Sequence, residues 1–291
     1  MAPGKPQLTP NRIGDRALVE KLAVLASHRA QAFVAEPGFD AGPALEALAA
    51  QAVAEQSDFF ARHGADRYVA HALGWSLAGG QVVGNGPAEI GACLAALPPP
   101  WRLAGLLSLA FAEDFAVLDG ARATIPWLAV CLPSSWAPEQ KVGRHFTEVH
   151  APVADNAVLL AAADHLAHLV TGSDRWERFV WTLTADPHLD RHPQRIAAVG
   201  WNPALDAEAL ADSAFLRTEH QTFIPVADAR LAVFAIHVEV EPLRAAVRSP
   251  ADARRLHAAL STMSPAVLAY RGLAGARDRL LAWLESAAAA A

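Results

Sequence analysis

The chain has 291 residues, of which 53% are hydrophobic, and its mean hydropathy is positive. These values indicate a globular protein with a substantial buried core. No stretch reaches the roughly 18 to 20 uninterrupted apolar residues that a bilayer span needs, and the N-terminal MAPGKPQLTPN lacks the apolar segment of a signal peptide. We therefore expect a soluble, cytoplasmic protein without a membrane partner.

Charge and cysteine content narrow the possible functions further. The net charge is −6, with acidic and basic residues interspersed and no Lys/Arg run, so nucleic acid is not an expected partner. Cys93 and Cys131 are the only cysteines, and an iron–sulfur cluster usually needs four thiolates. We expect both to be buried apolar side chains. Any redox chemistry would then take its electrons from another protein.

The N-terminal part of the chain predicts helices. Apolar residues recur at helical spacing from Asp15 to Glu36 and from Pro43 to near Gly64. We expect these two helices to pair as an antiparallel hairpin, which forms an N-terminal extension over about residues 15–64. GGQVVGNG, residues 79–86, is interpreted as a turn because it matches no phosphate-binding loop. A shorter helix over Ala88–Leu97 ends at three prolines.

From Trp101 onward the apolar runs are short and end at Gly, Pro or Asp, which is typical of strands. An antiparallel sheet fits this pattern better than alternating βαβ units. The fold class is therefore predicted to be α+β, as one domain over residues 1–291. The expected elements are strands within 103–120, 125–136 and 178–187, a loop over 141–156, a helix over 156–170, a hairpin over 216–240, and C-terminal helices near 250–260 and 274–290.

The hairpin Leu216 to Val240 places two histidines face to face. A symmetric turn between Asp228 and Ala229 pairs residues whose numbers sum to 457, and His220 and His237 satisfy this sum. Small side chains such as Thr222 and Ala235 share their face, while Phe223 and Phe234 on the other face are typical of a core. The pair could bind a metal, line a cofactor pocket, or share a hydrogen bond in the interior.

Common catalytic and metal-binding motifs are missing from the sequence. There is no HExxH, CxxC or HxH, and no G-x-S-x-G around a serine. A metal at the histidine pair would need nearby carboxylates, but we expect Glu219 and Glu239 on the opposite face. Glu113 and Asp114 are adjacent on a predicted strand, so they point to opposite sides and do not form an acid/base pair.

Several stretches resemble the haem-binding subunit family of haem-dependent oxidative N-demethylases. The order and spacing of these matches extend over about 170 residues. In this sequence they are EDFAVLDG (E-D-L-x-L-L in the family), CLPSSWAPEQKVGRHFTEVHAPV (C-F-P-S-x-W…E-K-x-G-x-x-L…I-H-x-P-V), FVWTLTADP (N-W-x-L, with Val180 replacing Asn), the hairpin (L-R-x-E-R-Q-T-L…F-x-I-R), and AVLAYRGL (Y-K-G-L).

The resemblance implies a PAS-like fold, an antiparallel sheet with surrounding helices that encloses a haem b held by histidine. In that family the haem activates dioxygen against a small secondary amine, and separate flavin and iron–sulfur components supply electrons. His150 matches the I-H-x-P-V histidine and is the implied ligand of the haem iron. Lys141 and Arg144 could meet the haem propionates, and Trp181 could pack on the porphyrin or in the core.

The sequence departs from the family at the histidine pair. Arginine is expected where this chain has His220 and again where it has His237. Histidine can be neutral, exchange protons near pH 7 and ligate iron, whereas arginine stays charged. We expect His220, His237 and Arg217 near the distal pocket. The change could alter the amine substrate, supply a distal acid/base histidine, or make His220 an iron ligand.

The leading hypothesis is a haem-dependent enzyme that oxidises a small nitrogen-containing substrate with dioxygen. One alternative is a PAS-type haem sensor, although the sequence has no coiled-coil linker or effector module. Another is a ligand-binding protein without a cofactor, in which the histidines are only packed. Haem binding separates the first two from the third, and turnover of secondary amines separates the first from the second.

Overall fold

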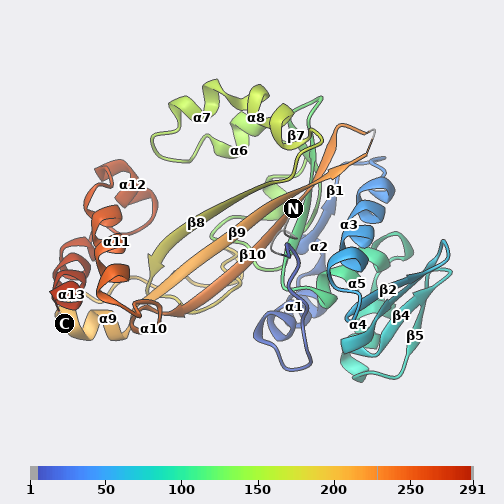
Figure 1. The fold of residues 1–291 in the computed structure, drawn as a ribbon, viewed down its shortest axis with the longest axis horizontal. Helices are drawn as coiled ribbons and strands as arrows, with labels where there is room; N and C mark the ends of the chain where they lie inside the picture. Colours follow the sequence, from blue (N-terminus) through green and yellow to red (C-terminus); the bar gives the residue numbers. More distant parts are fainter. Residues whose placement is uncertain (1–5, 228, 290–291) are drawn as a thin grey trace.

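A computed structural model describes residues 6–227 and 229–289 and shows a mixed α+β fold built on two antiparallel sheets (Figure 1). The larger sheet has the strand order β1-β7-β6-β10-β9-β8 and the smaller has the order β2-β3-β4-β5. The strands are β1 (Phe33–Ala35), β2 (Phe60–His63), β3 (Arg67–Ala70), β4 (Trp75–Ala78), β5 (Gln81–Gly84), β6 (Asp114–Asp119), β7 (Thr124–Ala129), β8 (Trp176–Thr184), β9 (Phe215–Val226) and β10 (Leu231–Pro242).

Helices cover both ends of the large sheet and part of one face. The α-helices are α1 (Arg16–Ser27), α2 (Arg29–Ala32), α3 (Gly42–Glu55), α4 (Ala88–Ala96), α5 (Arg102–Ala110), α6 (Phe146–His150), α7 (Ala157–Ala161), α8 (Ala163–Val170), α9 (Ala207–Asp212), α10 (Leu243–Ala246), α11 (Pro250–Ser261), α12 (Pro265–Tyr270) and α13 (Arg277–Ala289). Three short 3-10 turns are η1 (His71–Leu73), η2 (Pro99–Trp101) and η3 (Pro138–Gln140).

The predicted hairpin register is confirmed. Every pair between β9 and β10 has residue numbers that sum to 457, and His220 lies directly opposite His237. The sequence places Asp228 in the turn, but this residue lies outside the described residues. β8 adds to the other side of β9 and places Phe179 opposite His220. The alternation of side chains defines two faces. We call the side with His220, His237 and Phe179 the histidine face, and the side with Arg217, Glu219, Gln221 and Arg178 the arginine face.

Apolar packing covers much of both faces. On the histidine face, Ile224, Val233 and Ala235 belong to the main hydrophobic core, and α3 packs there against β9 and β10. On the other face, Phe223 and Phe234 stack with ring centroids 4.8 Å apart, as the predicted core pairing requires. A second core at the far end of the sheet joins β8 to the C-terminal helices α9 to α13. The α+β prediction is confirmed.

The N-terminal prediction was wrong in part. The expected helix to Glu36 ends at Ser27, and Phe33–Ala35 instead forms the edge strand β1 beside β7. The second helix ends at Glu55, and residues 60–84 form the small sheet, so GGQVVGNG holds a turn and also a strand. α1 packs against α4 and α5, whereas α3 packs against β2, β9 and β10. The two helices therefore do not form the expected hairpin.

A second error concerns the apolar run after Trp101. It was predicted to be a strand, but Arg102–Ala110 is the helix α5. Every residue from Ala104 to Ala110 is buried. A helix that is buried on all sides has no polar face, so the periodic signal of a helix is absent from its sequence. The C-terminal helix extends to Ala289, and Ala290 lies outside the described residues.

Candidate functional site: a histidine and a polar chain on the arginine face

His150 ends a short helix inside the region that was predicted to be a loop. The helix α6 begins with reciprocal hydrogen bonds, because His145 Nδ1 accepts from the Thr147 amide and Glu148 accepts from the His145 amide. One turn later, His150 Nδ1 lies 2.8 Å from the Phe146 carbonyl oxygen, and the two rings stack at 4.0 Å. The carbonyl can only accept, so Nδ1 carries the proton and Nε2 keeps its lone pair.

The surroundings of His150 favour its neutral form. Burial lowers the pKa of His150, and the positive charges of Arg178 and Lys141 lower it further. A neutral imidazole with Nδ1 held by a carbonyl is the form in which histidine binds a metal through Nε2. The geometry of α6 therefore leaves the Nε2 lone pair of His150 without a role within the helix, and ligation by His150 stays a prediction.

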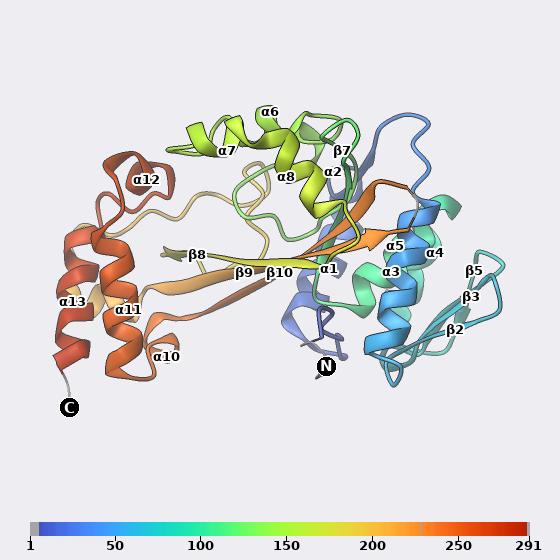
Figure 2. The same cartoon turned by 45° about the horizontal axis from the view of Figure 1, so that its top comes forward.

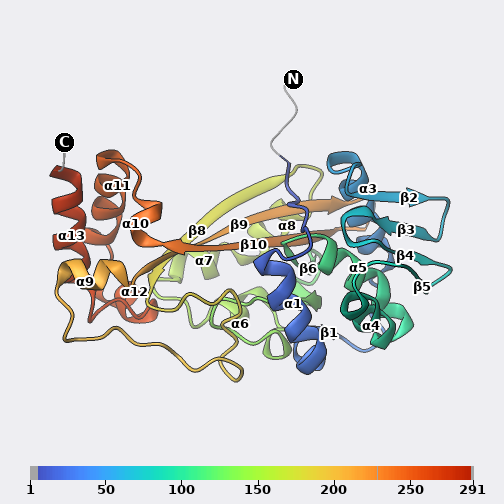
Figure 3. The same ribbon diagram turned by 90° about the horizontal axis from the view of Figure 1, so that it is seen from below.

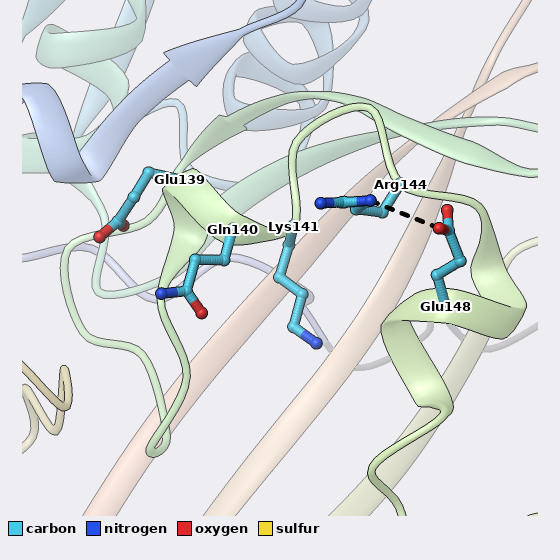
Figure 4. Close-up of a pocket in the computed structure, with 5 residues that line it drawn as sticks. All are labelled: Glu139, Gln140, Lys141, Arg144 and Glu148. Carbon is cyan, nitrogen blue, oxygen red and sulfur yellow. Dashed lines mark hydrogen bonds and ion pairs between the residues drawn. The ribbon is translucent and has the colours of Figure 1, made fainter.

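Lys141 and Arg144 lie beside α6, at a polar cavity of about 480 Å³ (Figure 4). The cavity is lined by Glu139, Gln140, Lys141, Arg144 and Glu148. Lys141 Nζ donates to the Val149 carbonyl at 2.9 Å, and burial lowers the pKa of Lys141. Arg144 lies 3.4 Å from Glu148 in an exposed ion pair. The two predicted propionate partners thus share one opening next to the His150 helix.

The helices α6, α7 and α8 cover the sheet without packing into a core. Figure 2 shows them above the β8–β10 part of the large sheet. No residue from 146 to 170 belongs to any of the three hydrophobic clusters, and α6 and α7 contain no buried residue. Their closest backbone contacts are with one another rather than with the strands. Apolar side chains of this layer, such as Leu159 and Leu160, stay half-buried.

The strands opposite α6 carry a continuous chain of polar groups. Arg178 donates to Gln221, Gln221 donates to one oxygen of Glu219, and Ser134 donates to the other. Arg217 Nε donates to Ser134 Oγ at 2.9 Å. Each residue of β8 and β9 in this chain points to the arginine face, as the strand register requires.

The inner end of the polar chain is structural. Arg217 is 2% exposed and donates to the carbonyl oxygens of His188 and Leu189, each at 2.9 Å. Burial lowers the pKa of Arg217 to about 10, so it remains a cation at neutral pH. These hydrogen bonds fix the loop after β8 and the Ser134 turn. Arg217, predicted as a pocket residue, is thus fully engaged with protein groups.

The outer end of the chain is open. Arg178 is exposed to solvent, yet enough protein surrounds it that burial lowers its pKa. The charge of Arg178 also lowers the pKa of His150, so the two groups lie within electrostatic range of each other.

The histidine pair lies on the other side of the sheet. His220 Nε2 is 2.7 Å from the Glu177 carboxylate, and the His220 ring stacks on Phe179 at 4.4 Å. His237 Nδ1 lies 3.4 Å from Thr9 Oγ1 and 3.7 Å from Glu113. The structure therefore separates His220 and His237 from His150 and from Arg217, because residues 217 and 220 have opposite parity along β9.

Two further expectations change with this geometry. Glu239 shares the face of His237, contrary to the prediction, because the two residues are two positions apart; Glu219 lies opposite, as expected. Even so, no group of three or more His, Cys, Asp or Glu side chains suited to a metal ion occurs among residues 6–227 and 229–289. Trp181 also lies on the histidine face and packs beside Arg271 and the C-terminal core, away from His150.

A neutral imidazole with a lone pair on Nε2, together with nearby cations, can hold a haem in a protein. His150, Lys141 and Arg144 fit such a group. A comparison with protein families supports this class. Residues 17–281 match the family described as haem-dependent oxidative N-demethylase, alpha subunit-like, and the chain belongs to this family. Within the described residues, no helix is long and apolar enough to cross a bilayer.

Sequence reasoning missed Arg178, Ser134, Glu219 and Gln221 as members of the site. The signal was present in part. Arg217, Glu219 and Gln221 alternate along β9, so a strand assignment alone places all three on one face. The sequence has no G-x-S-x-G around a serine, which left the Ser134 hydroxyl without an expected role. Arg178 could not be assigned, because its position depends on how α6 folds back over β8.

Proposed function

We propose that this protein is a haem-dependent oxidative enzyme that removes a methyl group from a small N-methylated amine. The observation that carries the proposal is the His150 imidazole, whose Nδ1 is held by the Phe146 carbonyl, which leaves a lone pair on Nε2. The family match over residues 17–281 supplies the chemical class. His150 is the proposed ligand of a haem b iron.

We propose that the fold is PAS-like, with residues 1–291 as one haem-binding domain. The large antiparallel sheet with α6 to α8 over one face supports this assignment. Lys141 and Arg144 are the proposed partners of the haem propionates, since both line the opening beside α6. Two propionates need cations at such an opening, where solvent also reaches.

When bound, haem supplies the site at which dioxygen is reduced for attack on the N-methyl carbon. The net change consumes one dioxygen, two electrons and two protons, and releases formaldehyde, water and the demethylated amine. The chain has two cysteines, so a separate flavin or iron–sulfur protein is the proposed source of electrons. Cys131 is buried and Cys93 partly so, and burial raises the pKa of both thiols, which keeps them protonated.

The chain's own residues bind the amine. Glu219 is an acceptor for a substrate N–H, because Ser134 and Gln221 fix its carboxylate. Arg217 anchors Ser134 and so positions Glu219 rather than touching substrate. His220 and His237 face the other side of the sheet, so we assign the acid/base role to Glu219 instead of to the histidines. The layer α6 to α8 lies over this part of the sheet.

Haem reconstitution followed by turnover tests this function. The purified chain should bind one haem per molecule and then release formaldehyde from a secondary amine when a surrogate reductase supplies electrons. Absence of stoichiometric haem binding would overturn the proposal. Haem binding without any formaldehyde, from a panel of N-methylated amines, would instead favour a sensor.

A further inference from the structure

The arginine face carries a cation and an anion side by side, which suggests what kind of amine it takes. We propose that the substrate is an N-methylated amino acid, whose carboxylate binds Arg178 and whose ammonium binds Glu219. The inference rests on the proposed function and deepens it by naming the substrate class. N-methylglycine is the smallest amine of this class and serves as the probe below.

Arg178 has the binding capacity that the proposal needs. Its Nε donates to Gln221, and its position on β8, opposite Gln221 on β9, points the side chain toward the arginine face. The side chain is open to solvent, and its charge acts on His150. A guanidinium has a planar set of donors that matches a carboxylate with two parallel hydrogen bonds. Arg178 can therefore hold Gln221 and still present its terminal nitrogens to a ligand.

Glu219 supplies the complementary charge. Ser134 donates to one of its oxygens and Gln221 to the other, which fixes the plane of the carboxylate. Each carboxylate oxygen accepts more than one hydrogen bond, so acceptor capacity remains for an ammonium group. Glu219 is half-buried, which strengthens an ion pair formed there relative to one in open solvent.

Gln221 sets the spacing between the two charges. Its amide oxygen accepts from Arg178 and its amide nitrogen donates to Glu219, so a single amide group separates the cation from the anion. In an N-methyl amino acid one carbon separates the ammonium from the carboxylate. Such a zwitterion, aligned antiparallel to the Arg178–Glu219 pair, meets an opposite charge at each end. A simple alkylamine satisfies Glu219 alone and leaves Arg178 without an anion.

The main competitor for Arg178 is a haem propionate. Lys141 and Arg144 lie together at a separate opening beside α6 and are better placed as a pair for the two propionates. The two roles of Arg178 predict different results. If Arg178 binds a propionate, its substitution changes haem affinity and changes the binding of all amines equally. If Arg178 binds the substrate, its substitution weakens the binding only of amines that carry a carboxylate.

Optical titration of the haem-loaded protein tests the proposal without relying on turnover. Ferric holoprotein is titrated with N-methylglycine and, separately, with dimethylamine, and the dissociation constants are read from the Soret difference spectrum. We expect N-methylglycine to bind at least about tenfold more tightly, since a charged hydrogen-bond pair contributes about 1.5–3 kcal/mol. Equal constants for the two amines, or tighter dimethylamine binding, would overturn the inference.

Substitution of Arg178 separates the roles. In Arg178→Gln, the preference for N-methylglycine over dimethylamine should fall about tenfold or more, while haem retention stays within about twofold. Arg175→Gln is the matched control. Arg175 is an exposed arginine next to β8, and its side chain contacts Gln51 and Glu55 instead of Gln221. A parallel loss of haem in Arg178→Gln would assign Arg178 to a propionate and overturn the proposal. If haem binds and simple amines are demethylated but N-methylglycine neither binds nor reacts, the inference fails alone.

Discussion

The two faces of the large sheet carry histidines in opposite situations. On the histidine face, His220 is bonded to Glu177 and stacked on Phe179, and His237 lies against Thr9 and Glu113. On the other side, His150 bonds one backbone carbonyl and lies in a layer of helices that belongs to no hydrophobic cluster. The number of histidines on a face is therefore a poor guide to the site. We propose that the lone pair on the Nε2 of His150 is the better one.

The largest expected effect concerns the support of the arginine face. Arg217→Met removes the donors to Ser134, His188 and Leu189, and leaves buried carbonyls without partners. Loss of a buried cation of this kind costs about 3–5 kcal/mol of unfolding free energy. Urea unfolding measures this loss of unfolding free energy. Arg248→Met, at an arginine whose side chain is 75% exposed, should stay within about 0.5 kcal/mol. A loss below about 1 kcal/mol in Arg217→Met would show that Arg217 is not the anchor.

The next effect concerns the buried Glu113 beside His237, and it is tested through the pH dependence of the unfolding free energy. Burial raises the pKa of Glu113 to about 7, and its carboxylate accepts from the Thr9 amide at 3.0 Å. The folded state keeps a proton that the unfolded state loses between about pH 4.5 and 7, so stability falls as pH rises through this window. Across this window the unfolding free energy should fall by about 3 kcal/mol in total. Glu113→Gln is neutral throughout, and its unfolding free energy should lack this fall.

His237 provides a control, because its effect on stability should change with pH in the opposite direction. Burial lowers the pKa of His237, so the unfolded state binds more protons below about pH 6.5. Stability therefore rises with pH up to that value, and His237→Gln should remove the rise. Chemical unfolding across pH 4.5 to 8 measures both variants. Identical pH profiles for wild type and Glu113→Gln would contradict a buried, protonated Glu113 at this face.

The smallest expected effect is spectroscopic. The double variant His220→Gln, His237→Gln changes only the histidine face, so the Soret and visible bands of the haem-loaded protein should match those of wild type. Cross-strand and exposed ion-pair contacts of this kind contribute about 1 kcal/mol or less, so folding should persist. A shifted Soret band or loss of haem in this variant would place the pair at the iron and remove the distinction between the two faces.

The sequence predicted the parts of the fold that depend on local periodicity. The β9–β10 register followed from alternation and a symmetric turn, because a slip by one residue would move Ile224 and Phe223 to the wrong faces. The helix α5 and the small sheet of residues 60–84 were missed, since a uniformly buried helix shows no period and four-residue strands are too short to show alternation.

For the candidate site, the sequence offered only single residues. The family resemblance implied His150, and the lone pair on its Nε2 follows from a bond to Phe146 that the sequence does not reveal. His220 and His237 were assigned to the same pocket because the register gives their mutual distance but not which helices cover each face. The nearness of Arg178 to His150 depends on α6 to α8, whose placement over the sheet is a tertiary feature. Figure 2 shows this layer and the N-terminal segment on opposite sides of the strands, and Figure 3 shows the C-terminal helices and the small sheet at opposite ends of the molecule.

The most direct test of the account is the absorption spectrum of His150→Ala loaded with haem. The account predicts loss of the histidine-ligated Soret and visible bands, and their recovery when free imidazole is added, because the space below α6 remains. His165→Ala, at an exposed histidine of α8, should leave the spectrum unchanged. A wild-type spectrum in His150→Ala without added imidazole would contradict ligation by His150 and, with it, the assignment of the arginine face as the haem site.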